Sequence, residues 1–175
     1  RIWAGAEYWT NPMENWEISN GKLACISGGE NRNVHLLTRE YSTGGTFAIS
    51  VNSEVTAATK KGGNVGIKLV GDSQVPGYRS RVFQHAAGIH AGYDASGVLF
   101  IAAKSVKCPA GLKSGKLTLS GDDKQWTLTL ADASSEKVVA EVSTAAKDVV
   151  GNIALFCNHP LKTTGGQGKR GGGFG

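Results

Sequence analysis

The sequence is poor in charged residues and has no long hydrophobic run. Only 19% of its 175 residues are charged, and the net charge of +5 comes from lysines and arginines scattered singly along the chain. Nucleic-acid-binding proteins usually gather their basic residues into a patch or run, so we expect no nucleic-acid partner. No apolar stretch approaches the ~18 residues that a membrane-spanning helix needs, and we therefore expect no membrane partner.

Recognisable catalytic and cofactor-binding motifs are missing as well. No acid pair has the short strand spacing that many sandwich glycosidases use, and no G-x-S-x-G string marks a serine nucleophile. The string Gly166-x-Gly168-x-x-Gly171 matches the dinucleotide-binding pattern, but no helix or downstream carboxylate follows it. We expect no cofactor and favour a binding role over an enzymatic one.

Cysteine is scarce, with three residues at Cys25, Cys108 and Cys157. Three cysteines cannot all pair within one chain, and their spacing matches no zinc or redox motif. Cys25 and Cys157 can form a disulfide if the first and last strands lie side by side. The alternative, which we favour, is three small buried hydrophobic residues.

Glycine is abundant and separates short alternating strands. The 25 glycines stand mostly as single breaks between apolar runs, and Asn20-Gly21 predicts a hairpin turn. The run 98–103 is apolar on both faces and predicts a central strand, whereas 144–148 is the one helical candidate. About a dozen short strands without a long helix predict an all-β, two-sheet antiparallel β-sandwich over residues 1–160. The glycine-rich residues 161–175 are expected to be a loop or linker.

Polar side chains recur along the strands predicted between Lys68 and Asp94. Aromatic rings can lie on the apolar surface of a sugar, arginines can bind anionic groups, and the remaining polar groups can bond hydroxyls. The alternative is a solvated outer sheet face with ordinary cross-strand pairs. The predicted ligand-binding residues are Tyr78, Arg79, Arg81, His85, His90, Tyr93 and Asp94.

Two candidate metal sites follow from the same kind of inspection. His85 and His90 straddle a turn with Asp94 four residues further on, and adjacent strands can bring these three together as ligands for a catalytic metal ion. We favour no metal there, because single histidines are common on polar sheet faces. The cluster from Glu30 to His35 can coordinate a structural calcium ion through its oxygens. The interpretation that we prefer is that its polar side chains tie down a loop.

Five turn and core segments carry a family resemblance: Trp16–Leu23 (WEISNGKL), Asn33–Thr38 (NVHLLT), Gly63–Ile67 (GNVGI), Gly77-Tyr78 and Gly151–Leu155 (GNIAL). Together they resemble the concanavalin A-like lectin/glucanase jelly roll. More narrowly, they are similar to the lectin-like domains of bacterial secreted PhoD-like phosphatases and of the 3-keto-disaccharide hydrolase group. The resemblance implies two sheets whose concave face or rim binds glycans, sometimes with a structural calcium.

These observations lead to one main functional hypothesis and two alternatives. The main hypothesis is a non-catalytic carbohydrate-binding or accessory domain of a secreted or periplasmic bacterial protein, attached to a further domain that holds any catalytic site. Its ligand would be a glycan or polysaccharide, with anionic groups favoured by the arginines. The alternatives are a small sugar-processing hydrolase that uses His85, His90 and Asp94, and a structural or assembly module whose sheet face packs on a neighbouring domain.

Overall fold

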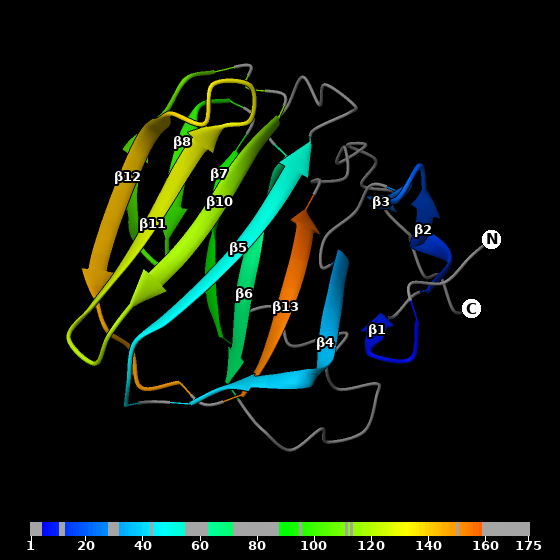
Figure 1. Cartoon of the computed structure of the whole chain (residues 1–175), viewed down its shortest axis with the longest axis horizontal. Coiled ribbons are helices and arrows are strands. Elements are labelled where there is room, and N and C mark those ends of the chain that lie inside the picture. The colour runs from blue at the N-terminus through cyan, green and yellow to red at the C-terminus, as the bar shows by residue number, and fades with distance from the viewer. Residues whose placement is uncertain are drawn as a thin grey trace, which may run out of the picture.

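The chain folds into two antiparallel sheets packed face to face, with a small hairpin beside them (Figure 1). The computed structural model describes residues 5–10, 13–27, 32–42, 44–54, 63–71, 88–94, 96–110, 112, 114–149 and 151–158. Within those residues the one helical element is a single 3-10 turn, η1 (Met13–Asn15). The predicted all-β antiparallel sandwich, of jelly-roll type, is therefore confirmed.

The larger sheet has seven strands, and every neighbouring pair in it is antiparallel. Strand β13, close to the end of the described chain, lies between β4 and β6, so segments far apart in sequence become neighbours. In spatial order the strands are β1 (Tyr8–Thr10), β4 (Arg32–Tyr41), β13 (Gly151–Asn158), β6 (Asn64–Gly71), β7 (Ile89–Asp94), β8 (Val98–Ile101) and β9 (Lys104–Lys107).

The smaller sheet has four strands and covers one face of the larger sheet. Its spatial order is β12 (Val138–Ala145), β11 (Gln125–Asp132), β10 (Ser114–Gly121) and β5 (Phe47–Glu54). The predicted alternation near Phe47 is confirmed, because burial changes at every step along β5. The turn between β10 and β11 is fixed by Asp122, whose carboxylate accepts hydrogen bonds from the backbone N–H groups of Lys124 and Gln125, both at 2.8 Å.

A separate two-stranded sheet is formed by β2 (Trp16–Ser19) and β3 (Lys22–Cys25). Asn20 and Gly21 both have positive φ, 51° and 70°, as a two-residue type I′ turn requires. The hairpin that Asn20-Gly21 predicts is therefore confirmed.

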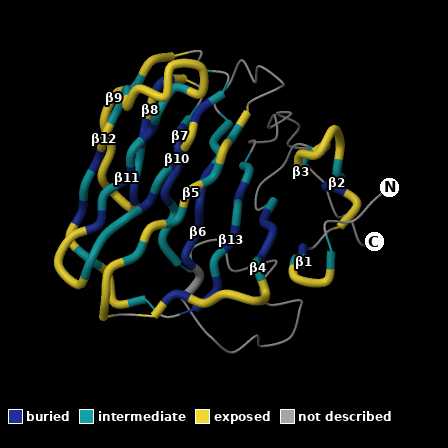
Figure 2. The backbone as a smooth tube through the Cα atoms, viewed as in Figure 1, coloured by how far each residue is buried: buried dark blue, intermediate teal, exposed yellow. Residues whose placement is uncertain are grey.

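The hydrophobic core fills the space between the two larger sheets (Figure 2). Trp126 is fully buried at one end, where its ring meets Tyr41 and Phe47 edge-on at centroid distances of 5.4 and 5.6 Å. Burying an aromatic side chain of this size is among the largest favourable contributions that one residue makes. Other fully buried members are Ile67, Leu69, Ala91, Leu99, Ile101, Leu117, Leu119, Leu128 and Leu130.

Two sequence predictions about individual elements need correction. The strand expected at 98–103 does lie inside the sheet, between β7 and β9, but it is shorter: β8 ends at Ile101, the chain turns through Ala102 with φ of 50°, and the edge strand β9 follows. No glycine, proline or asparagine marks that turn, so it could not be recognised from the sequence. The expected helical turn at 144–148 does not form either, because Thr144 and Ala145 continue β12.

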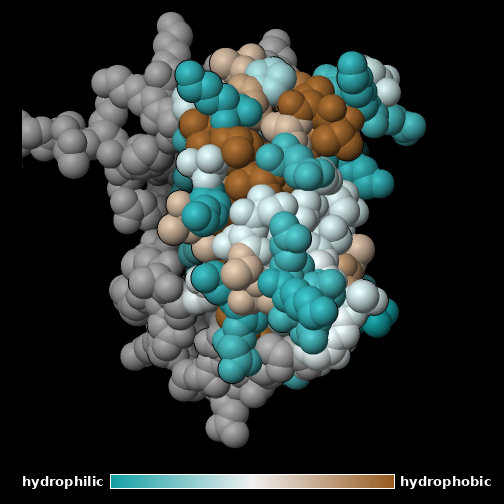
Figure 3. Space-filling view, turned by 90° about the vertical axis from the view of Figure 1, so that its left-hand side faces the viewer, coloured by the Kyte–Doolittle hydropathy of each residue, from teal (hydrophilic) through white to brown (hydrophobic). Residues whose placement is uncertain are grey.

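All four residues of the edge strand β9 are exposed. Lysines stand at both of its ends, Lys104 and Lys107, and charged side chains of this kind discourage pairing with another chain. Figure 3 views the molecule from the side on which β9 and β12 lie, and it shows a mainly hydrophilic surface with a smaller hydrophobic area. Exposed apolar side chains on these strands include Val106 and Val138.

Candidate ligand-binding face

The seven-stranded sheet has an inner face against the core and an outer face turned away from the four-stranded sheet. Ile67 and Leu69 of β6 belong to the core, so Lys68 between them points to the outer face. The strand register then places one residue from each of five neighbouring strands in a line across this face. We call this line the polar row; its members are Trp9, His35, Ala154, Lys68 and His90.

A second line lies next to the polar row on the same face. Register pairs Phe156 with Gly66, Gly66 with Gly92, and Gly92 with Phe100. We call the set Asn33, Phe156, Gly66, Gly92 and Phe100 the glycine row, since Asn33 lies opposite Phe156 on β4. Neither row contains a carboxylate.

Both rows are more buried than an outer sheet face usually is. Lys68 is 2% exposed and His35 is 4% exposed, although charged and polar side chains normally reach the solvent. Phe156 and Asn33 are also buried, whereas Trp9, His90 and Phe100 are half-buried. The polar groups of this face therefore lie in an environment of low polarity, where hydrogen bonds and charges act more strongly than in water.

His90 is directly opposite Lys68 and is neutral at physiological pH. Burial, and secondly the positive charge of Lys68, together lower the pKa of His90 to about 4. A neutral imidazole has one N–H donor and one acceptor nitrogen. His90 can thus both donate a hydrogen bond to a ligand hydroxyl and accept one from it.

The two paired glycines let β6 and β7 pack closely, and Gly92 also leaves room for the ring of Phe156. A Cβ atom on Gly66 would lie 2.1 Å from the carbonyl oxygen of Ala91, and one on Gly92 would lie 3.0 Å from the ring of Phe156. The ring of Phe156 contacts His90 at a centroid distance of 5.0 Å and Phe100 at 6.4 Å. Phe156, His90 and Phe100 therefore form one aromatic cluster above the glycine pair.

The far end of the polar row is held by β1. The Trp9 and His35 rings lie 5.7 Å apart, and the buried hydroxyl of Thr10 donates a hydrogen bond to the Asn33 carbonyl at 2.5 Å. These contacts fix β1 against β4 and so fix the position of the Trp9 ring. Four residues of the predicted calcium cluster, those from Arg32 to His35, belong to β4 rather than to a loop, and Glu30 and Asn31 lie outside the described residues.

Three of the seven predicted ligand residues lie within the described chain. His90 and Asp94 share the outer face, because Lys68 and Asn64 of β6 are their register partners. The Asp94 carboxylate accepts a hydrogen bond from the Ser96 backbone N–H at 2.7 Å, so it helps to form the turn into β8. Asn64, opposite Asp94, accepts a hydrogen bond from the Asn158 side-chain amide at 3.2 Å.

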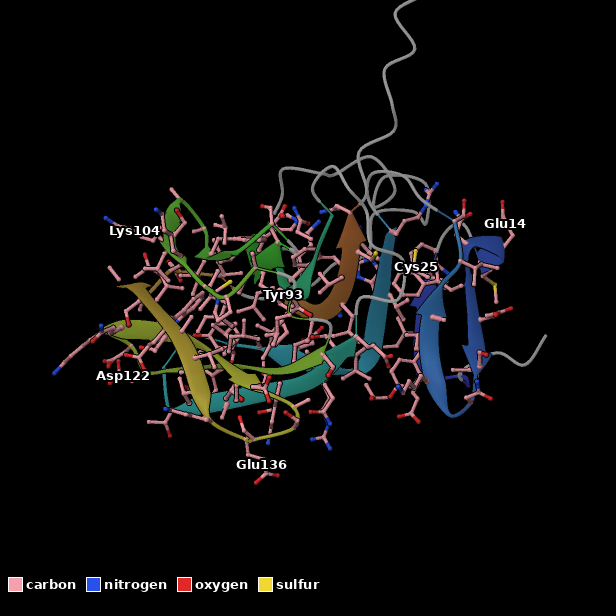
Figure 4. The ribbon with its side chains drawn as sticks, turned by 90° about the horizontal axis from the view of Figure 1, so that it is seen from above. Glu14, Cys25, Tyr93, Lys104, Asp122 and Glu136 are labelled. Carbon is pink, nitrogen blue, oxygen red and sulfur yellow. The ribbon has the colours of Figure 1, made fainter. Side chains whose placement is uncertain are left out.

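Tyr93 is on the opposite face from His90. It is 1% exposed and belongs to the core cluster, and its hydroxyl accepts a hydrogen bond from Ser53 of β5 at 3.4 Å. Figure 4 shows the Tyr93 side chain in the layer between the two sheets. Tyr93 therefore contributes to packing between the sheets and not to the outer face. The remaining predicted residues, Tyr78, Arg79, Arg81 and His85, lie outside the described residues.

The described residues do not form a metal site on this face. His90 and Asp94 are four residues apart on one strand, about 13 Å at a rise of about 3.3 Å per residue, which is too far for both to bind one ion. Across the described ranges, no group of three or more His, Cys, Asp and Glu side chains could hold a metal ion.

Sequence reasoning assigned no site role to three residues of the two rows, Trp9, Phe156 and Phe100, and it placed Asn33 and His35 in a candidate calcium cluster instead. Their alignment depends on register between strands that are far apart in sequence, which no local pattern reveals. Local signals in the sequence did indicate which face two other residues occupy. Tyr93 alternates in step with the apolar residues Ile89 and Ala91 of β7, so its side chain is expected on the core face. Lys68 lies between two apolar residues of β6, so its side chain is expected on the outer face.

Comparisons with known proteins do not assign this chain to a family. No protein-family model matches the sequence, and no curated protein matches it either. In the described part of the chain, no helix is both long and apolar enough to cross a membrane.

Proposed function

We propose that this chain is a non-catalytic carbohydrate-binding or accessory domain and that it binds a glycan on the outer face of its seven-stranded sheet. One observation carries the proposal: the polar row aligns Trp9, Lys68 and His90 on one face across five strands. A line of that kind suits an extended ligand such as an oligosaccharide better than a compact one.

The chemistry of the two rows matches that of a sugar. Half-buried rings at Trp9 and Phe100 offer flat apolar surfaces for the C–H face of a pyranose. The neutral imidazole of His90 suits hydroxyl groups, which both donate and accept hydrogen bonds. These half-buried residues would contact the ligand first, with the buried Lys68 behind them.

The charge of the face favours glycans with acidic groups. Lys68 supplies a positive charge on this face, opposite the neutral His90. A charge in a poorly solvated setting attracts an opposite charge more strongly than a surface lysine does. Uronate or sulfate groups are therefore favoured over neutral sugars.

The accessory role is supported by the composition of the two rows. Glycoside hydrolysis uses two carboxyl groups a short distance apart, whereas neither row contains a carboxylate. Together with the resemblance to concanavalin A-like jelly rolls, this supports a domain that binds for a catalytic partner domain. We propose a secreted or periplasmic bacterial protein as its setting.

The proposal is tested by calorimetric titration of the protein with neutral, uronate-containing and sulfated polysaccharides. We expect binding to at least one acidic polysaccharide, and His90→Ala is expected to weaken it about tenfold, the value of one good hydrogen bond. Trp9→Ala is expected to weaken it at least as much. Arg81→Ala tests the predicted contribution of that arginine in the same assay.

Ser50→Ala is the matched control, because Ser50 lies on the exposed outer face of the four-stranded sheet. It should leave the affinity unchanged, and near-UV circular dichroism should confirm that all variants are folded. If no polysaccharide binds, or if His90→Ala and Trp9→Ala bind as well as the wild type, the proposed function is wrong. In that case the structural or assembly hypothesis becomes the better one.

A further inference from the structure

Two of the three cysteines meet between the β2–β3 hairpin and the seven-stranded sheet. Cys25 ends β3, and Cys157 lies near the end of β13, where register pairs it with Arg32 of β4 and Val65 of β6. The thiols of Cys25 and Cys157 are in hydrogen-bond contact with each other, and neither belongs to a disulfide in the structure. Figure 4 shows Cys25 on the side of the hairpin that faces the sandwich.

The surroundings of this thiol pair hold the two sulfur atoms in place. Cys25 Sγ donates a hydrogen bond to the carbonyl oxygen of Ser27 at 3.4 Å, and Arg32 Nε donates to the same oxygen at 3.4 Å. Because Arg32 is also the register partner of Cys157, one side chain connects the surroundings of both cysteines. Both cysteines are half-buried, so a small reagent can reach them.

The two thiols differ in acidity. The hydrogen bond from Cys157 lowers the pKa of Cys25 to about 7, helped by Ser27 and by the charge of Arg32 and opposed by burial. The pKa of Cys157 is raised, mainly because its proton is shared with Cys25 and secondly because it is buried. Cys25 is therefore the nucleophile of the pair, since the thiolate is the reactive form.

We propose that Cys25 and Cys157 are a disulfide-forming pair, which locks the β2–β3 hairpin to β13 when the chain meets a disulfide oxidant. The contact between the thiols and their shared position beside Arg32 carry this inference, which is independent of the proposed glycan binding. It also revises the preference stated from sequence, in which all three cysteines were only small buried hydrophobic residues.

The reaction is a thiol–disulfide exchange with a small-molecule or protein disulfide. The Cys25 thiolate attacks one sulfur of the oxidant, and the other oxidant sulfur leaves as a thiolate that takes up a proton. Cys157 then loses its proton and attacks Cys25, and the second half of the oxidant leaves as a thiol. Two cysteine thiols are oxidised to one disulfide, and one disulfide of the oxidant is reduced to two thiols.

The third cysteine provides a built-in control. Cys108 packs against the core, and burial raises its pKa, so it should react slowly. Cleavage after lysine and arginine separates the three cysteines into peptides 23–32, 108–113 and 148–162. Any disulfide can therefore be assigned from a non-reduced digest.

The experiment treats the reduced full chain with oxidised glutathione at pH 7, blocks remaining thiols and analyses it by mass spectrometry. We expect the loss of two hydrogen atoms, a linked pair of peptides 23–32 and 148–162, and a blocked Cys108. The melting temperature of the wild type and of Cys108→Ser should rise on oxidation by about 5–15 °C, because the bond closes a long loop. Cys25→Ser and Cys157→Ser should show no such rise.

Labelling of the reduced wild type gives a further test that does not depend on the folding of any variant. It measures which cysteine reacts first and how its rate depends on pH. In the reduced wild type, iodoacetamide should label Cys25 fastest, with half of the maximal rate near pH 7. A disulfide that includes Cys108, a glutathione adduct that persists on Cys25, or no reaction at all would each overturn the proposal.

Discussion

The two sheets of the sandwich share one inner core but have very different outer faces. On the four-stranded sheet, hydroxyl side chains pair across strands: Ser50 with Thr118 at 2.9 Å, and Thr127 with Ser143 at 2.8 Å. On the seven-stranded sheet, the outer face buries Lys68, His35 and Phe156. The geometry of a sandwich requires that the inner face of each sheet is buried, but it does not require burial of the outer face.

The difference indicates where function is to be sought. A ladder of hydroxyl side chains that pair across strands is enough to solvate the outer face of a sheet, and it costs little free energy. Burying a lysine beside a histidine costs free energy that only specific neighbours or a specific role can offset. The outer face of the seven-stranded sheet is therefore the part of the molecule whose composition differs most from that of an ordinary solvated sheet face.

The largest effect should come from the shared core. Trp126→Ala removes a fully buried ring that packs against Tyr41 and Phe47, and we expect the free energy of unfolding to fall by about 3–5 kcal/mol. Its neighbour Thr127 points to the outer face, so Thr127→Ala should cost at most about 1 kcal/mol. Urea unfolding at pH 7 measures both. Equal losses would mean that the two faces of β11 are not distinguished by burial as described.

A smaller but still large loss is expected on the outer face of the seven-stranded sheet. Gly66→Ala would bring a methyl group to within 3 Å of three backbone atoms on β7, which cannot move aside as a side chain could. We expect a cost of about 3 kcal/mol in urea unfolding, at the upper end of the overpacking range.

Ser120→Ala, on the outer face of the four-stranded sheet, is the control for Gly66→Ala and should change stability by less than about 0.5 kcal/mol. If Gly66→Ala also changed the free energy of unfolding by less than about 0.5 kcal/mol, β6 and β7 would not be packed as closely at Gly66 as described.

The sequence predicts the inner face better than the outer one, for a physical reason. Alternation with a period of two separates the faces of a strand, and the Asn20-Gly21 turn fixes a hairpin locally; both predictions are confirmed. Which polar face becomes buried depends on contacts between distant segments, so the burial of Lys68 could not be foreseen. The short strand β1, which positions Trp9, has no alternating pattern from which it could be predicted.

The burial of His90 predicts a pH dependence of stability. The folded pKa of about 4 is below the ordinary histidine value of about 6.5, so between these values the unfolded chain binds the proton and the folded chain does not. Stability is therefore full above pH 6.5 and is lost as the pH falls towards 4. For a half-buried group we expect a loss on the order of 2 kcal/mol.

His90→Gln isolates this contribution, because glutamine does not titrate in that range. Urea unfolding at pH 7.5 and pH 4.5 should show the wild type losing about 2 kcal/mol more than His90→Gln. Lys68→Met should raise the pKa of His90, measured by NMR titration, since the charge of Lys68 is one of its two causes. The exposed Lys116→Met should not change it. A His90 pKa at its ordinary value would show that the outer face is open to water.

The smallest effect concerns the hydroxyl ladder of the four-stranded sheet. The exposed Ser50 and the half-buried Thr118 are hydrogen-bonded across β5 and β10, so a double-mutant cycle with alanine should give a coupling free energy of about 0.5 kcal/mol or less. Water replaces an exposed hydroxyl partner readily, whereas on the opposite sheet Phe156 and His90 meet in a half-buried ring contact that water cannot replace. The same cycle on Phe156 and His90 should therefore give a larger coupling. Equal couplings would mean that the two outer faces do not differ energetically, and the main structural reason for placing a ligand on the seven-stranded sheet would be lost.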